Sequence, residues 1–95
     1  MTTTIESSEI SIHAVRVYTY LEACGQKWAT AADVASGAQV APRTARMYVK
    51  RLVDLGIADL AEVFPAHRYR VSGKAKQRNR GYWNRLKEAQ TIFDL

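Results

Sequence analysis

The stretch from Pro42 to Gly56 constrains this chain most, because its pattern is that of an amphipathic helix. Pro42 suits the first helical turn, where its missing N–H is not needed, and Gly56 suits the left-handed position that follows a helix. We therefore predict a helix from about Pro42 to Leu55, with one apolar face and one cationic ridge. The apolar face comprises Ala45, Tyr48, Val49, Leu52 and Leu55, and the ridge comprises Arg43, Arg46, Met47, Lys50 and Arg51.

A longer helix is predicted ahead of this stretch. Residues 1–7 are rich in Thr and Ser and are expected to form a frayed tail. From Ser8 to Cys24 apolar residues recur at helical spacing, a serine at position 7 or 8 can cap the start, and Gly25 marks the end. A second, weaker stripe lies about opposite the first, so we expect this helix to pack between the core and either the C-terminal helix or a second subunit. The main stripe is Ile10, Ala14, Val17, Leu21 and Cys24, and the weaker one is Ile12, Val15 and Thr19.

A short helix and a turn connect these two helices. Residues 26–29 are too few for a helix, and Trp28 is placed either to pair in a small strand or to cover the core. Thr30 and Asp33 have capping-box spacing, which predicts a helix over residues 31–36 that Gly37 ends. Residues 38–41 then form the turn. Two helices joined by a short turn are typical of a helix-turn-helix.

After Gly56 the apolar period changes to two, which is typical of strands. The pattern breaks at Pro65 and resumes over residues 67–71, so we predict a hairpin with its tip at about Phe64 to His67. A polar segment from Lys74 leads to a C-terminal helix. Gly81 in a helix interior costs about 1 kcal/mol relative to Ala, so we expect either a bend at this position or a late start of the helix near Asn79. The apolar stripe of this helix comprises Tyr82, Trp83, Leu86, Ala89, Ile92 and Phe93.

This order of elements resembles the winged helix-turn-helix of bacterial and phage regulators of the MarR, IclR and ArsR type. The resemblance covers residues 8–72, and it implies an α+β, mostly α fold. A three-helix core and a two-stranded wing would occupy residues 8–73, and residues 74–95 would add a basic segment and a helix. Ala41 departs from the pattern, because the family usually has a Ser, Thr or Asp cap there. The resemblance rests on Thr30-Ala-Ala-Asp33-Val-Ala35-Ser-Gly37, Pro42-Arg43-Thr44-Ala45, Tyr48-Val-Lys50-Arg51-Leu52, Leu55-Gly56-Ile57 and Tyr69-Arg70-Val71-Ser72.

The positive charge is concentrated in the second part of the sequence. Residues 1–41 carry two Lys or Arg against four Asp or Glu, whereas residues 42–95 carry twelve against five. The net charge of +5 and the pI of about 9.7 favour a polyanionic partner. We interpret the first part as a support and the second as a contact surface.

The outer face of the helix from Pro42 is the first candidate surface for DNA. The resemblance implies that this helix enters the major groove, where Arg can bind the O6 and N7 atoms of guanine. The hydroxyl of Thr44 or the helix N-terminus can bind phosphate. An ordinary solvated helix face is the alternative interpretation. The candidate residues are Arg43, Thr44, Arg46, Met47, Lys50 and Arg51.

The wing and the segment after it supply further candidates. Eight basic residues and no acidic ones lie between Val63 and Lys87. The wing of this fold commonly lies along the DNA backbone or reaches the minor groove, which makes His67, Arg68 and Arg70 candidates. The following residues Lys74 and Lys76 either track phosphates or keep a polar segment soluble.

The sequence predicts neither an enzyme nor a metal or cofactor site. His13 and His67 lie on different predicted elements without a cysteine or carboxylate cluster, and Cys24 is the only cysteine. No arrangement of nucleophile, base and acid appears, and there is no Gly-rich phosphate loop. The sequence shows no signal pattern, and its apolar runs stay well short of the roughly 18 residues that span a bilayer. We therefore expect a cytoplasmic protein without membrane contact.

The predicted function is that of a DNA-binding transcriptional regulator whose partner is double-stranded DNA. A winged-helix module for protein interaction, replication or partition of a mobile element, or an RNA-binding protein, is the alternative. The sequence identifies no effector. A homodimer is expected, because the apolar stripe of the C-terminal helix needs a cover and similar regulators dimerise through flanking helices, although packing within one chain is also possible. The predicted dimerisation residues are Ile12, Val15, Tyr82, Trp83, Leu86 and Phe93.

Overall fold

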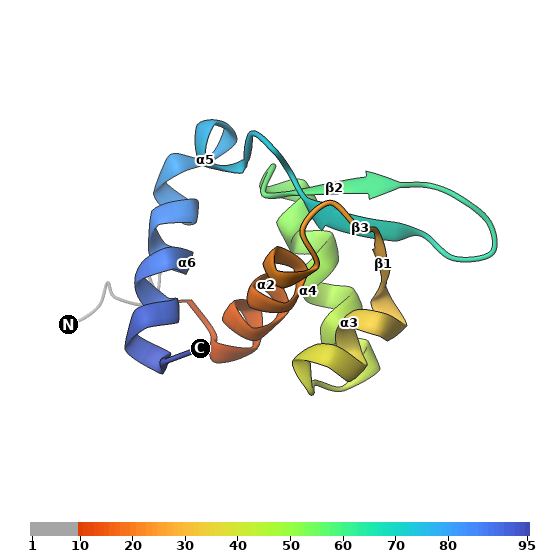
Figure 1. The fold of residues 1–95 in the computed structure, drawn as a ribbon, viewed down its shortest axis with the longest axis horizontal. Helices are drawn as coiled ribbons and strands as arrows, with labels where there is room; N and C mark the ends of the chain where they lie inside the picture. The colour runs from red at the N-terminus through yellow and green to blue at the C-terminus, as the bar shows by residue number, and fades with distance from the viewer. Residues whose placement is uncertain (1–9) are drawn as a thin grey trace.

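The fold is a winged helix-turn-helix with a further helix at its C-terminal end (Figure 1). The structure is a computed structural model, and it describes residues 10–95; the tail expected over residues 1–7 lies outside that range. The mostly helical α+β class is confirmed. The elements are α2 (Ile12–Cys24), β1 (Ala29–Thr30), α3 (Ala31–Ala38), α4 (Pro42–Asp54), β2 (Ala58–Ala61), β3 (Arg68–Val71), α5 (Ala75–Arg78) and α6 (Arg80–Phe93).

Helix α2 passes through the centre of the core. It begins at Ile12 rather than at the expected Ser8, because the hydroxyl of Ser11 accepts hydrogen bonds from the backbone N–H groups of His13 and Ala14 at 3.0 and 3.4 Å. The serine caps expected at positions 7 and 8 lie outside the described residues. Gly25, with a φ of 65°, follows the helix as predicted. Apolar side chains are buried on two sides of this helix, namely Ala14, Val15, Val17, Tyr18 and Leu21.

Helix α3 begins where the sequence predicts but ends later. The capping box is formed, because Asp33 N–H donates to the Thr30 hydroxyl and Thr30 N–H donates to the Asp33 carboxylate, both at 3.1 Å. The prediction that Gly37 ends the helix is wrong, since α3 continues to Ala38 and ends at Gln39 in the left-handed conformation. Packing explains the glycine at position 37 instead, because a Cβ there would overlap the ring of Tyr20.

Helix α4 has the two faces that its sequence predicts. Ala45, Val49 and Leu52 are buried, whereas the basic ridge faces solvent. The helix ends at Asp54, and Gly56 follows with a φ of 80°. Ala41 is the N-cap residue and provides no side-chain hydrogen bond to the first turn.

The unsatisfied start of α4 leads to a stability prediction. Ala41→Ser should raise the free energy of unfolding by about 1 kcal/mol, because a serine oxygen can accept from a free N–H of the first turn. Denaturant melts of the two proteins measure this difference. A lower stability of the serine variant would show that Ala41 does not cap the helix in solution.

The wing forms part of a three-stranded antiparallel sheet with the order β1-β3-β2. Strand β3 is central: Asp59 of β2 lies opposite Arg70, and Ala29 of β1 lies opposite Tyr69. The small strand expected near Trp28 is therefore present as β1. The loop between β2 and β3 projects beyond the helices on the side opposite to α6 (Figure 1).

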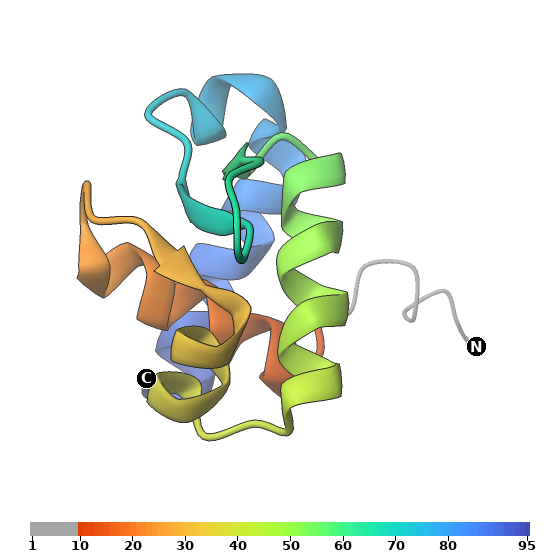
Figure 2. The ribbon, with the colours of Figure 1, turned by 90° about the vertical axis from the view of Figure 1, so that its right-hand side faces the viewer.

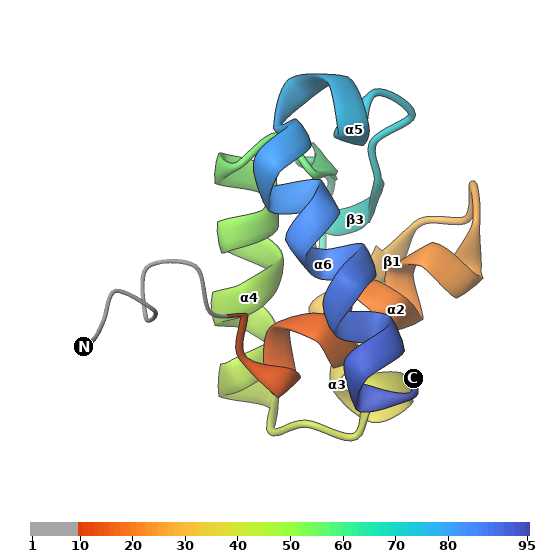
Figure 3. The same ribbon diagram turned by 90° about the vertical axis from the view of Figure 1, so that its left-hand side faces the viewer.

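Helix α6 lies across α2 within the same chain (Figure 3). It begins at Arg80, close to the predicted start, because the Asn79 side chain accepts a hydrogen bond from Tyr82 N–H at 3.2 Å. Leu86 is fully buried and Ala89 is buried beside it. The apolar stripe of the C-terminal helix is thus covered in part by α2.

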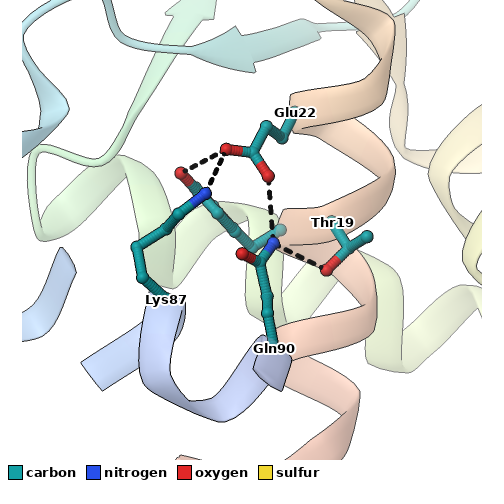
Figure 4. A network of polar contacts seen from close by, with 5 residues as sticks. Thr19, Glu22, Lys87 and Gln90 are labelled. Carbon is teal, nitrogen blue, oxygen red and sulfur yellow. Dashed lines mark hydrogen bonds and ion pairs between the residues drawn. The ribbon is translucent and has the colours of Figure 1, made fainter. Parts of the chain in front are cut away.

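A polar network also joins α2 to α6 (Figure 4). The Lys87 ammonium lies 2.6 Å from the Glu22 carboxylate, and the Gln90 amide donates to Glu22 and to the Thr19 hydroxyl, both at 3.0 Å. Partial burial works to raise the pKa of Glu22, but the hydrogen bonds from Lys87 and Gln90 and the lysine charge outweigh it, so this pKa lies below its ordinary value. Glu22 is therefore ionised at neutral pH and can hold the two helices together.

Candidate nucleic-acid interface

A groove of about 700 Å³ lies between the start of α3, the outer face of α4 and the wing. Figure 2 shows α4, the β2–β3 hairpin and α3, the elements whose residues line the groove, with the right-hand side of Figure 1 facing the viewer. The groove brings together three of the predicted DNA-binding residues, Arg46, Lys50 and His67. Its remaining lining is Thr30, Ala31, Ala32, Val53, Asp54, Leu60, Ala66 and Tyr69.

The two α4 cations in the groove are available to a ligand. Arg46 and Lys50 are exposed and lie about one helical turn apart on the same face. Neither forms an ion pair with any residue in the range 10–95. Asp54 is the only acidic residue of the groove lining, and it stands at the C-terminal end of α4. The groove lining therefore carries two basic side chains against one acidic one.

The rest of the ridge on α4 extends on both sides of the groove. Arg43 is exposed in the first turn, Thr44 is half-buried, and Met47 is 47% exposed. The Arg51 guanidinium lies 5.6 Å from the centroid of the Tyr48 ring, outside the groove lining. Arg51 also lies close enough to Tyr82 to oppose the rise that burial causes in the pKa of that phenol. Arg51 thus lies on the α6 side of the ridge.

The two arginines of β3 have different surroundings. Arg68 is exposed at the start of the strand. Arg70 is half-buried, its guanidinium carbon lies 4.3 Å from the Trp28 ring centroid, and its Nε lies 3.7 Å from the Asp59 carboxylate. Both are DNA candidates from the sequence, and the contacts of Arg70 tie its side chain to the sheet. Arg68 and His67 are the exposed candidates of the wing.

Lys74 and Lys76 do not line the groove. They belong to the segment around α5, which lies on the far side of the molecule from the wing loop (Figure 1). The Lys76 ammonium is 5.2 Å from the centroid of the Trp83 ring, which also has Lys87 at 5.6 Å. Lys76 therefore extends over α6 rather than toward the groove.

The predicted dimerisation residues divide into buried and exposed ones. Val15 and Leu86 are fully buried within this single chain, so they contribute to its own core and present no surface to a second copy. Tyr82 and Trp83 are half-buried against the same core. Ile12 and Phe93 stay exposed at the start of α2 and the end of α6.

Sequence reasoning missed the α3 side of the groove. Thr30, Ala31 and Ala32 line it, and the only sequence signal was the capping box, which marks this helix start.

Within residues 10–95 no cluster of three or more His, Cys, Asp or Glu side chains could hold a metal ion. In the same range, none of the helices combines the length and the apolar character needed to cross a bilayer.

Solved structures with similar folds include several DNA-binding proteins. A putative DNA-binding protein from Ralstonia eutropha has a TM-score of 0.62 and 19% identity, over 73% of this chain and 91% of its own. A MepR variant from Staphylococcus aureus, bound to an oligodeoxyribonucleotide, has a TM-score of 0.63 and 14% identity, over 94% of this chain and 67% of its own. A MarR-family transcriptional regulator from Silicibacter pomeroyi has a TM-score of 0.63 and 13% identity, over 94% of this chain and 61% of its own. No protein-family model and no curated protein matches the sequence.

Proposed function

We propose that this winged helix-turn-helix chain is a DNA-binding transcriptional regulator whose groove receives double-stranded DNA. The observation that carries the proposal is the juxtaposition of Arg46, Lys50 and His67 around one groove on the outer face of α4. The two α4 cations have no acidic partner among the described residues, so a polyanion can neutralise them without breaking an internal ion pair. The MepR variant that is bound to an oligodeoxyribonucleotide has the same fold, which supports this assignment.

In this proposal α4 enters the major groove. An α-helix is about 10–12 Å wide with its side chains and the major groove is about 12 Å wide, so a helix with one free face can lie in it. Arg43, Arg46 and Lys50 lie on that face from the first turn to the third, where Arg or Lys side chains can reach guanine O6 and N7. The N-terminal end of α3, where Thr30 and Asp33 form the capping box, lines the same groove. The wing contributes Arg68 and His67 to the backbone or the minor groove.

The function is tested by selecting bound sequences from random duplexes and measuring affinity for the selected duplex over a range of salt concentrations. We expect log affinity to fall linearly with log salt, with a slope of roughly −0.9 for each neutralised phosphate. An RNA of the same sequence and an unselected duplex serve as controls. Stronger binding to the RNA would assign the groove to RNA, and the absence of any duplex binding would favour a protein-interaction role.

We further propose that two copies associate through exposed apolar residues of α2 and α6. Ile12, Ile92, Phe93 and Leu95 are exposed apolar residues at the start of α2 and the end of α6 or just beyond it. Covering them against a second copy about a two-fold axis would remove apolar surface from water and place two α4 helices on one duplex.

The dimer is tested by sedimentation equilibrium at micromolar concentration. The wild-type chain is expected at about twice its 10.7 kDa, and Phe93→Asp is expected to give a folded monomer, because a carboxylate would lose its water in the interface. Glu88→Gln, an exposed change on the same helix, is the matched control and should leave the mass unchanged. A wild-type protein that is monomeric both alone and on DNA would contradict the dimer.

A further inference from the structure

The loop of the wing exposes a continuous apolar segment. The four residues from Val63 to Ala66, Val-Phe-Pro-Ala, are all exposed. The Phe64 side chain is 95% exposed, more than that of any other large hydrophobic residue in the described chain, and Val63 is 44% exposed. Four consecutive apolar residues on a surface oppose solubility and folding unless they contact something. The loop is held far from the core by β2 and β3, so no described part of this chain covers the phenylalanine (Figure 1).

The position of this loop indicates what it contacts. Ala66 and His67, at the C-terminal end of the loop, form one wall of the groove that also contains Arg46 and Lys50. Arg68 follows His67 directly and is exposed, so the apolar segment is followed by a cationic side chain at the start of β3. A duplex lying along α4 and neutralised by these cations would therefore have the loop beside it. In that position we expect the Phe64 ring to reach base pairs that α4 does not cover.

From this arrangement we propose that Phe64 is a wedge that inserts at a base step in the minor groove and partly unstacks it. The inference rests on the proposed DNA-binding function and adds to it a residue, a groove and a deformation of the DNA. Proteins that enter the minor groove commonly use Phe or Pro side chains in this way, and the kinks they produce are roughly 20–90°. Stacking on a base also gives an exposed aromatic ring an apolar partner. Pyrimidine–purine steps are expected at the wedge site, because they unstack most easily.

The experiment uses the duplex that the wild-type chain selects, with 2-aminopurine placed in turn at successive positions of its flanks. Binding of the wild-type chain should raise the fluorescence at one step and bend the duplex, as measured by energy transfer between its ends. Phe64→Ala should lose both signals and bind about tenfold more weakly. Its preference at the wedge step should relax, while the preference at the α4 contacts and the salt dependence stay the same, because no charge has been removed. Phe64→Trp keeps a flat ring and should retain both signals.

Three results would overturn the inference. If the wild-type chain binds and Phe64→Ala keeps its fluorescence and bend, the wedge is wrong while the DNA-binding function stands. If Phe64→Ala instead changes the mass of the unliganded protein in sedimentation, the loop is a protein contact. If the wild-type chain binds no duplex, the inference fails together with the proposed function.

Discussion

Leu86→Ala is expected to lower the free energy of unfolding by about 2–5 kcal/mol, the range found when a buried leucine is truncated. Leu86 is fully buried, because α6 packs on α2 in the core of a single chain. The truncation removes apolar contacts and leaves a cavity, and the surrounding helices can shift to fill it only in part. A domain of this size has a total stability of about 5–15 kcal/mol, so the loss should be large in a denaturant melt.

Thr91→Ala on the same helix is the matched control. Thr91 is exposed, and its replacement should change the free energy of unfolding by no more than about 0.5 kcal/mol. Both variants should be measured at a protein concentration where the wild type is monomeric, so that association does not contribute. If Leu86→Ala costs as little as Thr91→Ala, α6 does not pack on α2 in solution.

The elements set by local chemistry could be predicted from the sequence. The two faces of α4 follow from the spacing of Val49 and Leu52 against Arg46 and Lys50, and these side chains are buried and exposed as predicted. The capping box of Thr30 and Asp33 forms because both partners lie within one turn. The groove could be predicted in part, since the residues on its α4 side belong to one helical face.

Contacts between distant segments could not be predicted in the same way. The α6 stripe fitted both packing on its own chain and a dimer, and only the three-dimensional structure places Leu86 beside α2. Gly37 looked like a helix end, but the nearby Tyr20 ring on α2 explains it instead. The contact between the Arg70 guanidinium and the Trp28 ring, which lies just before β1, could not be read from the spacing of the β3 residues. Each case depends on a partner at least about 17 residues away, a range that periodicity does not cover.

The second large effect concerns the groove cations. Arg46→Ala and Lys50→Ala should each weaken binding to the selected duplex by roughly 5- to 150-fold, which corresponds to about 1–3 kcal/mol for a base contact. If Arg46 contacts a base, its loss should also relax the preference at one position of the selected sequence. If Lys50 contacts a phosphate, its loss should reduce the salt slope by about one and leave the preference unchanged. Fluorescence anisotropy at several salt concentrations measures both quantities.

Lys27→Ala is the control that distinguishes direct contact between the groove and DNA from non-specific attraction by the net charge. Lys27 is exposed in the turn after α2 and is absent from the groove lining, yet its replacement removes the same charge as Lys50→Ala. Long-range attraction by the net charge of +5 would make the two lysine variants equally weak, and salt would screen both effects alike. Direct contact at the groove instead predicts a loss at position 50 that far exceeds the loss at position 27. Arg46 and Lys50 lie one turn apart on the same face of α4. The loss of binding free energy in the double variant should therefore differ from the sum of the two single losses, whereas an equal sum would show that the two side chains make independent contacts.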